Sequence, residues 1–440
     1  MLQPQTLPAS FSAVLQTLRP CFTGPSFRTF TVLTLGLISQ TGRRTVTGML
    51  TAAGLAGVWH HSRAYWLFTG ARWCADQLGL ALVTLIHDRL LAADAEVTIA
   101  VDDTLFRRSG RKVFGTGWHH DPTSPAPRKS CAWGNNWVVA GIIVWLPFLS
   151  RPICLPVLFR LWRKGDPAKA QAARELAELI AAACPGRHIH VVADGFYGTR
   201  HWRALDLRVT LTVALRANAA LSEIHTPVPG ANGRPKLIGD KIGTPADLAA
   251  RGGWHTVTVT RYGTPGRTQL IEHRCLWVGP LRTQPVRVIL TRDPDPRRPK
   301  HPYDLAILTT DLTTPAGQII ERYAARWPIE VSFHDAKHIT GAGQARTRTE
   351  TSVRRMVPFG LLTQSLIIIW YALHGHEPGD IDHRRRAAPW YTSKTEPSYE
   401  DMLIKLRRTL IAARFHPGTP RAPTAEETLA VHLAWANTAA

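Results

Sequence analysis

The 440-residue sequence has only six cysteines and no long uninterrupted apolar run. The cysteines are far apart and form no Cys-x-x-Cys pair, which argues against a zinc site and a disulfide framework and favours a reducing compartment. The first residues, Met-Leu-Gln-Pro-Gln, show no basic region followed by an apolar run, so we expect no secretory signal. The most apolar stretches, 137–149 and 356–373, are too short or contain polar residues, and neither predicts a membrane span.

Acidic residues are also scarce relative to basic ones. There are 53 Lys and Arg against 32 Asp and Glu, which gives a formal net charge of +21. Apolar residues make up 45% of the chain, so the charge does not belong to a disordered basic tail. A well-packed protein with this excess most often binds a polyanion, and nucleic acid is the commonest one. A basic fold with scattered surface arginines is the alternative at this point.

The length allows two or three domains, and the pattern of apolar residues divides the chain into regions. The N-terminal region reads as helical. Its run Thr41-Gly42-Arg43-Arg44-Thr45-Val46-Thr47 fits either a helix-turn-helix on DNA or an ordinary helical cap domain. The boundaries that we expect are 1–94 for the helical DNA-binding region, 95–215 and 304–375 for two parts of a core, 216–303 for a β-rich insertion, and 376–440 for a C-terminal linker and helices.

Within the first part of the core, apolar runs predict strands at 97–102, 137–146, 153–161 and 188–194. A helix is expected between the last two, with Asp166 and Pro167 at its start and Ala183 near its end. The first and fourth strands each end on an acid, Asp102 and Asp194. Three strands, a helix and a further strand, with acids at these two ends, predict an α/β fold with an RNase H-like core: a mixed five-stranded sheet with helices.

The second part of the core contains one more expected strand, 304–308, and then a helix from Pro315 to Lys337. Pro328 removes a backbone donor, so we expect a kink or a restart there. Farther along, an apolar helix is expected over 353–373 and an amphipathic helix after Ser398.

Three acids in this layout, Asp102, Asp194 and Glu330, predict two-metal phosphoryl chemistry. Mg²⁺ prefers oxygen ligands and keeps several waters, so a few carboxylates can hold a pair of ions about 3.5 to 4 Å apart. An isolated Asp at a strand end is usually a turn or cap residue, and only the joint placement of the three favours a metal site. Successive side chains of a strand point to opposite faces, so only one of Asp102 and Asp103 can face the metals.

The helix around Glu330 carries a second pattern. At 100° per residue, Tyr323, Arg326, Glu330 and Lys337 fall on one face. A phenol, a guanidinium and an ammonium beside a carboxylate suit a metal ligand next to a phosphodiester, with Tyr323, Arg326 and Lys337 contacting DNA. The alternative is a solvated face with Glu and Lys pairs, which is common on helices.

This Tyr-x2-Arg-x3-Glu-x6-Lys pattern resembles the signature of a large branch of bacterial insertion-sequence DDE transposases. Val101-Asp102-Asp103-Thr104 and Val192-Ala193-Asp194-Gly195 are similar to the motifs around that branch's first and second acids, and Thr104 favours Asp102 over Asp103. The resemblance implies an RNase H-like catalytic domain with a β-rich insertion, and catalysis by Asp102, Asp194 and Glu330 with two Mg²⁺ ions, for which Mn²⁺ can substitute.

The resemblance also implies a reaction and its partners. They are cleavage of DNA at the inverted-repeat ends of an element and strand transfer into target DNA, in a paired-end complex of two subunits. We therefore expect a homodimer on DNA in the bacterial cytoplasm, at the nucleoid and without a membrane. Members that excise through a hairpin stack an insertion-domain Trp on a flipped base. Trp254 and Trp277 are candidates, although an aromatic in a strand is more often a core residue. Arg107 and Arg108 are expected phosphate contacts.

Two rival functions remain open from the sequence. One is a transposase-derived DNA-binding protein without cleavage activity, which the intact acids disfavour. The other is an RNase H-like nuclease that cuts without joining. Inverted repeats around the gene and a short target duplication would favour transposition over both.

Overall fold

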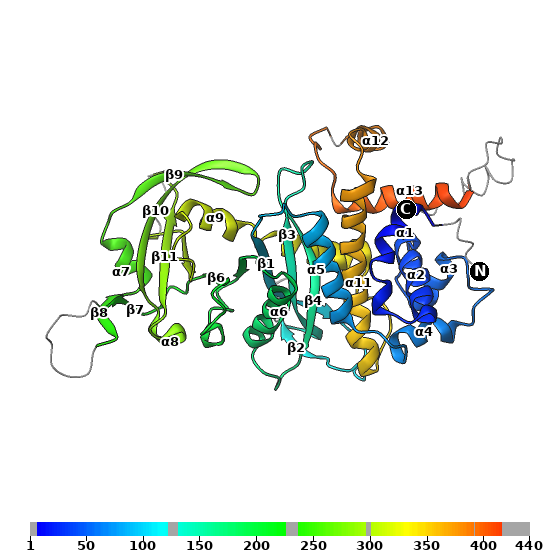
Figure 1. Ribbon diagram of the computed structural model, residues 1–440, viewed down its shortest axis with the longest axis horizontal. Coiled ribbons are helices and arrows are strands. Elements are labelled where there is room, and N and C mark those ends of the chain that lie inside the picture. The colour runs from blue at the N-terminus through cyan, green and yellow to red at the C-terminus, as the bar shows by residue number, and fades with distance from the viewer. Residues whose placement is uncertain (1–6, 122–130, 226–235, 296–300, 391, 416–440) are drawn as a thin grey trace.

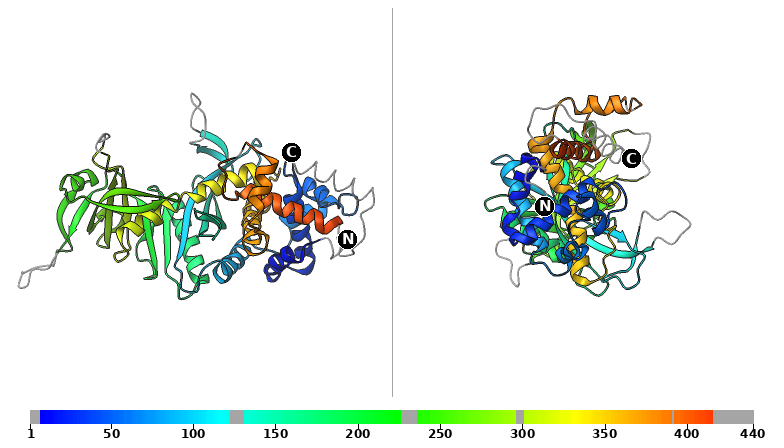
Figure 2. Two further views of the ribbon diagram at one scale, coloured as in Figure 1. Left: turned by 90° about the horizontal axis from the view of Figure 1, so that it is seen from above. Right: turned by 90° about the vertical axis from the view of Figure 1, so that its right-hand side faces the viewer.

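The computed structural model describes residues 7–121, 131–225, 236–295, 301–390 and 392–415. The molecule is elongated, with the strands of the middle of the chain at one end and the N-terminal helices at the other (Figure 1). The view from above, on the left of Figure 2, shows the same separation. The N-terminal helices are α1 (Ala9–Gln16), α2 (Gly24–Ser39), α3 (Val46–Ala52), α4 (His61–Thr69) and α5 (Ala75–Arg89). The helical character expected for this region is confirmed.

The central region follows these helices. Its elements are β1 (Val97–Arg107), β2 (Gly117–His120), β3 (Cys131–Val144), β4 (Ile153–Trp162), α6 (Lys169–Ala183), β5 (Ile189–Ala193) and β6 (Val209–Ala214). The four expected strands are all present. Helix α6 begins two residues after Pro167, because Asp166 accepts a hydrogen bond from the Arg163 backbone (2.9 Å) in a preceding turn instead of capping the helix.

The stretch after β6 is rich in strands, as expected. It contains β7 (Leu221–Ile224), β8 (Ile238–Gly243), α7 (Pro245–Ala250), β9 (His255–Arg261), β10 (Thr264–Leu276), α8 (Val278–Leu281), β11 (Pro285–Arg292) and β12 (Leu305–Thr309). The described residues after β12 are mostly helical: α9 (Ala316–Ala324), α10 (Pro328–Asp335), the π-helical turns η4 (Ala336–Thr340) and η5 (Tyr371–Gly375), α11 (Glu350–Trp370), α12 (Asp380–Ala387) and α13 (Tyr399–Phe415).

The described strands form one mixed sheet of twelve, in the order β2-β3-β1-β5-β6-β12-β11-β10-β7-β8, with β4 beside β3 and β9 beside β10. Strands β1, β5 and β6 are parallel, whereas β3, β4 and β12 run antiparallel to their neighbours. The sheet is therefore larger than the five strands expected. Strand β6, which the sequence analysis did not anticipate, joins the central strands to β12 and so to the strands of the following region.

The ends of β1 and β5 position the acids. Strand β1 was expected to end at Asp102, and this is wrong: it continues to Arg107. The reason is that its antiparallel pairing with β3 continues through Arg107↔Gly134. Its parallel pairing with β5 stops at Val101↔Ala193. Asp102 therefore lies in the middle of its own strand, but at the level where the neighbouring strand ends.

Helix α11 is the central helix of the packed core and contacts β4, α1, α4, α5 and α13. Among the described residues, one helix, Glu350–Gly375, is long and apolar enough to cross a membrane, but 89% of its most apolar window is buried inside the protein. Its apolar residues therefore pack against the sheet and the surrounding helices, and each fully buried Leu or Ile side chain contributes about 1.5–3 kcal/mol to stability.

Candidate functional site

Asp102 lies on β1, and Asp194 lies just beyond the end of the adjacent parallel strand β5. Asp194 directly follows β5, and its Oδ1 accepts a hydrogen bond from the backbone N–H of Phe196 (2.9 Å). Burial raises the pKa of Asp102 to about 7; the guanidinium of Arg326 opposes the shift, and the negative charge of Asp194 adds to it. The two carboxyl groups are thus close enough to repel each other when both are ionised.

Asp103 makes a different set of contacts. Its Oδ2 accepts hydrogen bonds from Lys169 Nζ (2.6 Å) and Asn136 Nδ2 (2.9 Å), and its Oδ1 accepts one from the Tyr197 hydroxyl (3.2 Å). Both carboxylate oxygens of Asp103 are occupied by protein donors. Asp102, by contrast, contacts the segment that leads to Glu330.

Arg326 connects Asp102 to Glu330. Its Nη1 donates to Asp102 Oδ2 (3.1 Å) and its Nη2 to Glu330 Oε1 (2.8 Å). Arg326 lies in the short connection between α9 and α10, where the chain restarts as a helix at Pro328, so the expected restart is confirmed. The expected continuous helix is wrong, since Tyr323, Glu330 and Lys337 belong to α9, α10 and η4, respectively. Arg326 nevertheless contacts both Tyr323 and Glu330, as expected for residues on one face.

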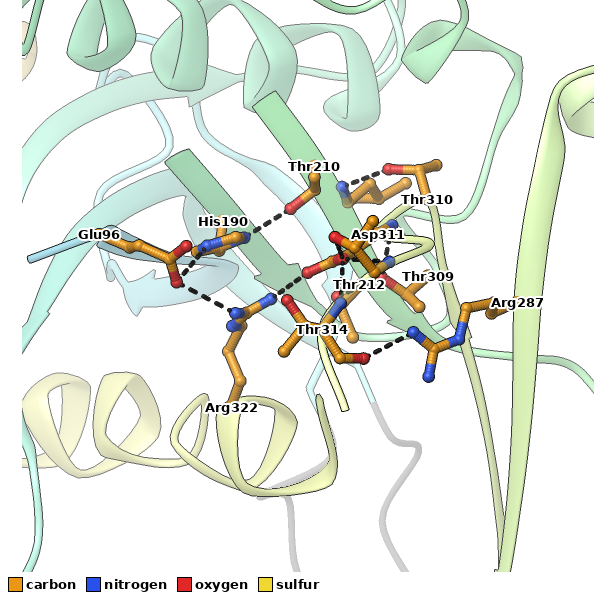
Figure 3. A network of polar contacts seen from close by, with 12 residues as sticks. Glu96, His190, Thr210, Thr212, Arg287, Thr309, Thr310, Asp311, Thr314 and Arg322 are labelled. Atoms are coloured by element: carbon orange, nitrogen blue, oxygen red, sulfur yellow. Dashed lines mark hydrogen bonds and ion pairs between the residues drawn. The ribbon is translucent and has the colours of Figure 1, made fainter. Parts of the chain in front are cut away.

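A second network fixes α9 one turn before Arg326 (Figure 3). Arg322 on α9 donates from Nη1 to Asp311 Oδ2 (2.8 Å), and its Nη2 lies 3.3 Å from Glu96 Oε2. His190 Nε2 approaches the same Glu96 oxygen to 2.8 Å, and its Nδ1 is 2.7 Å from the Thr210 hydroxyl. The network ties α9 to the residue before β1 and to the starts of β5 and β6, and so anchors the helix that precedes the segment of Glu330.

Asp102, Asp194 and Glu330 all line a cleft of about 2010 Å³. Eight lysine and arginine side chains line the same cleft, from segments far apart in the sequence: Arg43, Arg107, Arg108, Lys169, Arg216, Lys337, Arg346 and Arg348. Five acids lie among them: the three named above, Asp103 and Asp121. The cleft therefore combines a local acidic centre with a positive surround.

The expected phosphate contacts differ in their accessibility. Arg107 has 56% of its side chain exposed and pairs with Asp121 (2.6 Å). The guanidinium of Arg108 is turned inward, where it donates to Asn135 Oδ1 (3.0 Å) and to the carbonyl groups of Ala345 (3.1 Å) and Gly343, and burial lowers its pKa to about 10. Arg108 therefore anchors the end of β1 to the segment 343–345.

The remaining expected contacts are divided between the cleft and its surroundings. Lys337 lines the cleft with its Nζ 5.5 Å from the Phe106 ring centre, and burial lowers its pKa. Tyr323 and Arg326 are not part of the cleft wall; Tyr323 is half-buried, and burial raises its pKa. Neither Trp254 nor Trp277 lines the cleft: Trp277 is only 6% exposed, and Trp254 packs 4.0 Å from the Arg292 guanidinium.

Two aromatic side chains in the cleft were not anticipated. Trp118 on β2 is 71% exposed, and Phe196, two residues after Asp194, is 51% exposed. The position of Phe196, two residues after Asp194, could have indicated it from the sequence. Nothing in the sequence indicates Trp118, because its place in the cleft depends on the pairing of β2 with β3.

The Gly-Arg-Arg turn of the N-terminal region also reaches this site. Arg44 donates to the carbonyl groups of Thr41 (2.6 Å), Gly42 (2.6 Å) and Ile339 (3.0 Å), so it fastens the turn to the segment after α10. Its neighbour Arg43 lines the cleft. Arg44 therefore holds the turn in place through its hydrogen bonds, whereas Arg43 faces the cleft.

The three acids supply only oxygen ligands, and burial, together with the negative charges of Asp194 and Asp103, raises the pKa of Asp102. A divalent cation bound there would offset this surplus of negative charge. Among the described residues, no three His, Cys, Asp or Glu side chains are grouped closely enough to hold a metal by themselves. The set still fits Mg²⁺, which keeps several waters and needs only one or two carboxylates. Arg326 supplies part of the compensating positive charge between Asp102 and Glu330.

The fold and the site together define an α/β protein with a carboxylate centre inside a cationic cleft. Residues 17–269, more than half of the chain, match the family model described as a DDE superfamily endonuclease, and the chain belongs to this family. Enzymes of this superfamily generally use divalent metals. The matched range includes Asp102 and Asp194 and stops before Glu330.

Comparison with solved structures finds a piggyBac transposase synaptic complex with hairpin DNA, studied by cryo-EM. It has 9% sequence identity and a TM-score of 0.40, with 98% of this chain and 82% of that chain covered. No curated protein sequence matches this chain.

Proposed function

We propose that the protein is a DDE transposase that cleaves DNA at the inverted-repeat ends of its element and joins the ends to target DNA by cut-and-paste transposition. The observation that carries the proposal is the connection from Asp102 through Arg326 to Glu330, beside Asp194, in a cationic cleft of a DDE superfamily chain. The membership of the bacterial insertion-sequence branch rests on the Tyr-x2-Arg-x3-Glu-x6-Lys pattern.

Asp102, Asp194 and Glu330 are the residues that would hold two Mg²⁺ ions, or Mn²⁺ in their place. When bound, such ions activate the attacking water or 3′-hydroxyl and stabilise the leaving oxygen. The protein contributes by keeping Asp102 and Asp194 at the same level of adjacent strands and by carrying Glu330 on a helix fixed through Arg322 and Arg326. Asp103 has its oxygens occupied by Lys169, Asn136 and Tyr197, and we assign it a positioning role.

The cleft supplies the DNA contacts in this proposal. Arg107 and Lys337, with Arg43 on the facing turn, are placed to bind phosphate oxygens around the acids. Trp118 and Phe196 are exposed in the same cleft, and a ring in such a position can stack on an unpaired base. We propose this role for them in place of Trp254 and Trp277, neither of which lines the cleft.

The arrangement of the molecule supports the rest of the proposal. The strand order β4-β3-β1-β5-β6 is the one we assign to an RNase H-like core, with residues 216–303 as its insertion and 1–94 as a DNA-binding region. Two subunits would hold two element ends in a paired-end complex in the cytoplasm.

The test is cleavage of a labelled duplex that carries the DNA flanking the gene, with Mg²⁺. Asp102→Asn, Asp194→Asn and Glu330→Gln should each lower the cleavage rate by roughly a hundredfold to a thousandfold, the usual cost of removing one electrostatic contact to a transition state. Asp103→Asn is the matched control on the neighbouring residue, and it should keep its rate within about tenfold of wild type.

Specific nicking that survives all three changes would refute the assignment. Cleavage that depends on the acids but is never followed by joining would favour the nuclease over the transposase. Specific binding to the ends without any cleavage would favour the DNA-binding protein.

A further inference from the structure

Helix α10 separates the cleft from a second groove. Glu330 lines the cleft, whereas Trp327, Val331 and Asp335 line a groove of about 410 Å³ behind the same helix. The opposite wall includes Tyr262, at the tip of the β9–β10 hairpin. This hairpin arches over α9 towards the core (Figure 1). None of the acids assigned to the cleft lines this groove, so it is a distinct site.

Three aromatic side chains from different segments are exposed around this groove. Trp145 is 56% exposed, Tyr262 is 55% exposed and Trp327 is 48% exposed. Tyr262 has a φ of +55°, a left-handed conformation that residues other than glycine seldom adopt. The hairpin tip is held in place from the core side, since the Thr260 backbone donates to Glu321 Oε1 (2.6 Å). Exposed rings grouped in this way are typical of a binding surface.

The charge of the groove is opposite to that of the protein. Its lining contains Glu321, Asp335 and Glu396 but only one cationic side chain, Arg151, in a chain whose net charge is +21. Nucleic acid phosphates would be repelled there. A cation would be attracted, and the exposed rings can bind it through cation–π contacts.

Gln364 provides an unused acceptor in the groove lining. The side chain is 1% exposed, and its Nε2 donates to the Ser332 carbonyl (3.1 Å), which fixes the orientation of the amide because only the nitrogen can donate. Its Oε1 accepts no hydrogen bond in the structure. A buried acceptor without a partner costs free energy, and this one is closed off from solvent, so a donor gains from it only where the groove opens at Gln364.

We propose that this groove binds an arginine-bearing polypeptide segment of a partner protein. A guanidinium has five donors in a plane and can stack on aromatic rings, so it can use the rings, a carboxylate such as Asp335, and Gln364 together. An ammonium has a compact charge and cannot stack in this way, so lysine fits less well. This binding activity is separate from the DNA chemistry of the cleft.

The experiment titrates the full-length protein with the peptide acetyl-Gly-Arg-Arg-Gly-amide by calorimetry. The lysine peptide and the citrulline peptide of the same length are matched probes, since citrulline keeps the shape of arginine without its charge. We expect saturable binding of the arginine peptide, with affinity at least threefold weaker for lysine and more than tenfold weaker for citrulline.

Variants locate the binding. Trp327→Ala and Asp335→Asn should each lower the affinity for the arginine peptide by about fivefold or more. Arg151→Ala should raise this affinity or leave it unchanged. Trp118→Ala, in the cleft, should have no effect. Because Trp327→Ala can disturb folding, Asp335→Asn, which keeps the shape of the side chain, is the second variant, and each is accepted only with an unchanged urea midpoint.

Several results would overturn the proposal: no saturable binding up to millimolar peptide, equal binding of the arginine and citrulline peptides, or binding that the groove variants leave unchanged. DNA cleavage is not a readout here, so failure of the proposed function leaves this test intact.

Discussion

Replacement of Arg322 by alanine should destabilise the protein more than any comparable loss of a surface arginine. The Arg322 side chain is 10% exposed and its partner Asp311 is 5% exposed, so the pair is shielded from water. Burial by itself raises the pKa of Asp311, but hydrogen bonds from Thr314 and the ion pair with Arg322 outweigh it and hold the pKa of Asp311 well below its usual range. Arg322→Ala leaves this buried carboxylate without its counterion.

The size of the effect follows from the surroundings of Asp311. Removal of one partner of a buried ion pair costs about 3–5 kcal/mol. The lower end applies here, because the backbone N–H groups of Thr313 (3.1 Å) and Thr314 (3.0 Å) still donate to Asp311. At a urea dependence of about 3 kcal/mol per molar, a loss of about 3 kcal/mol lowers the midpoint of unfolding by about 1 M.

Arg354→Ala is the matched control. It removes an arginine of the same charge from another helix, where the pair with Glu350 is exposed (46% and 54%), and exposed pairs contribute about 0.2–1 kcal/mol. Urea unfolding followed by circular dichroism compares the two variants. Equal midpoints for Arg322→Ala and Arg354→Ala would refute the reasoning.

The same prediction has a pH dependence with a definite sign. The pKa of Asp311 is lowered on folding, so its stabilisation is present above the unfolded pKa of about 3.9 and is lost as the pH falls. The difference between wild type and Arg322→Ala should therefore be largest near neutral pH and narrow below about pH 4. A difference that grows on acidification would contradict the assignment of Asp311 as an ionised partner.

Two further predictions concern packing and thiol chemistry. Gly79→Ala should destabilise the protein by about 1–3 kcal/mol, because a Cβ on α5 would lie 2.0 Å from the Val157 carbonyl oxygen; Gly57→Ala, with no neighbour within 4 Å, should change thermal unfolding little. In the native protein, the exposed Cys74 should react with maleimide within minutes. Cys154 should react only after unfolding, because it is buried and burial raises the pKa of its thiol well above the usual range. Mass spectrometry of the labelled peptides distinguishes the two cysteines.

The strands that the sequence predicted share a local signal. Strands β1 and β5 are short runs of apolar residues with acids at or after them, and the restart at Pro328 follows from the missing N–H of proline alone. Strand β6 carries alternation of the same kind but was not anticipated. The continuous sheet that it creates depends on its pairing with both β5 and β12, and β12 lies far from it along the chain.

In the candidate site, too, the sequence predicted local patterns but not contacts between distant segments. The identity of the acids and their nearness to strand ends could be proposed from the sequence, since carboxylates after apolar runs are a local pattern. The choice of Arg326 as the link between Asp102 and Glu330 could not, because its side chain crosses between segments more than 200 residues apart. The inward turn of Arg108 and the exposure of Trp118 likewise depend on neighbours that only folding brings together.

The sequence by itself determined the positive charge, the helical ends, the main strands, and the acids and basic residues from which a site could be built. These properties depend on residue type and on spacings of a few residues. The tertiary structure decided which carboxylate faces Arg326, which arginines remain accessible, and that an acidic aromatic groove lies behind the helix of Glu330. Those outcomes depend on burial and on contacts between distant segments, and the energies of such contacts exist only once the chain has folded.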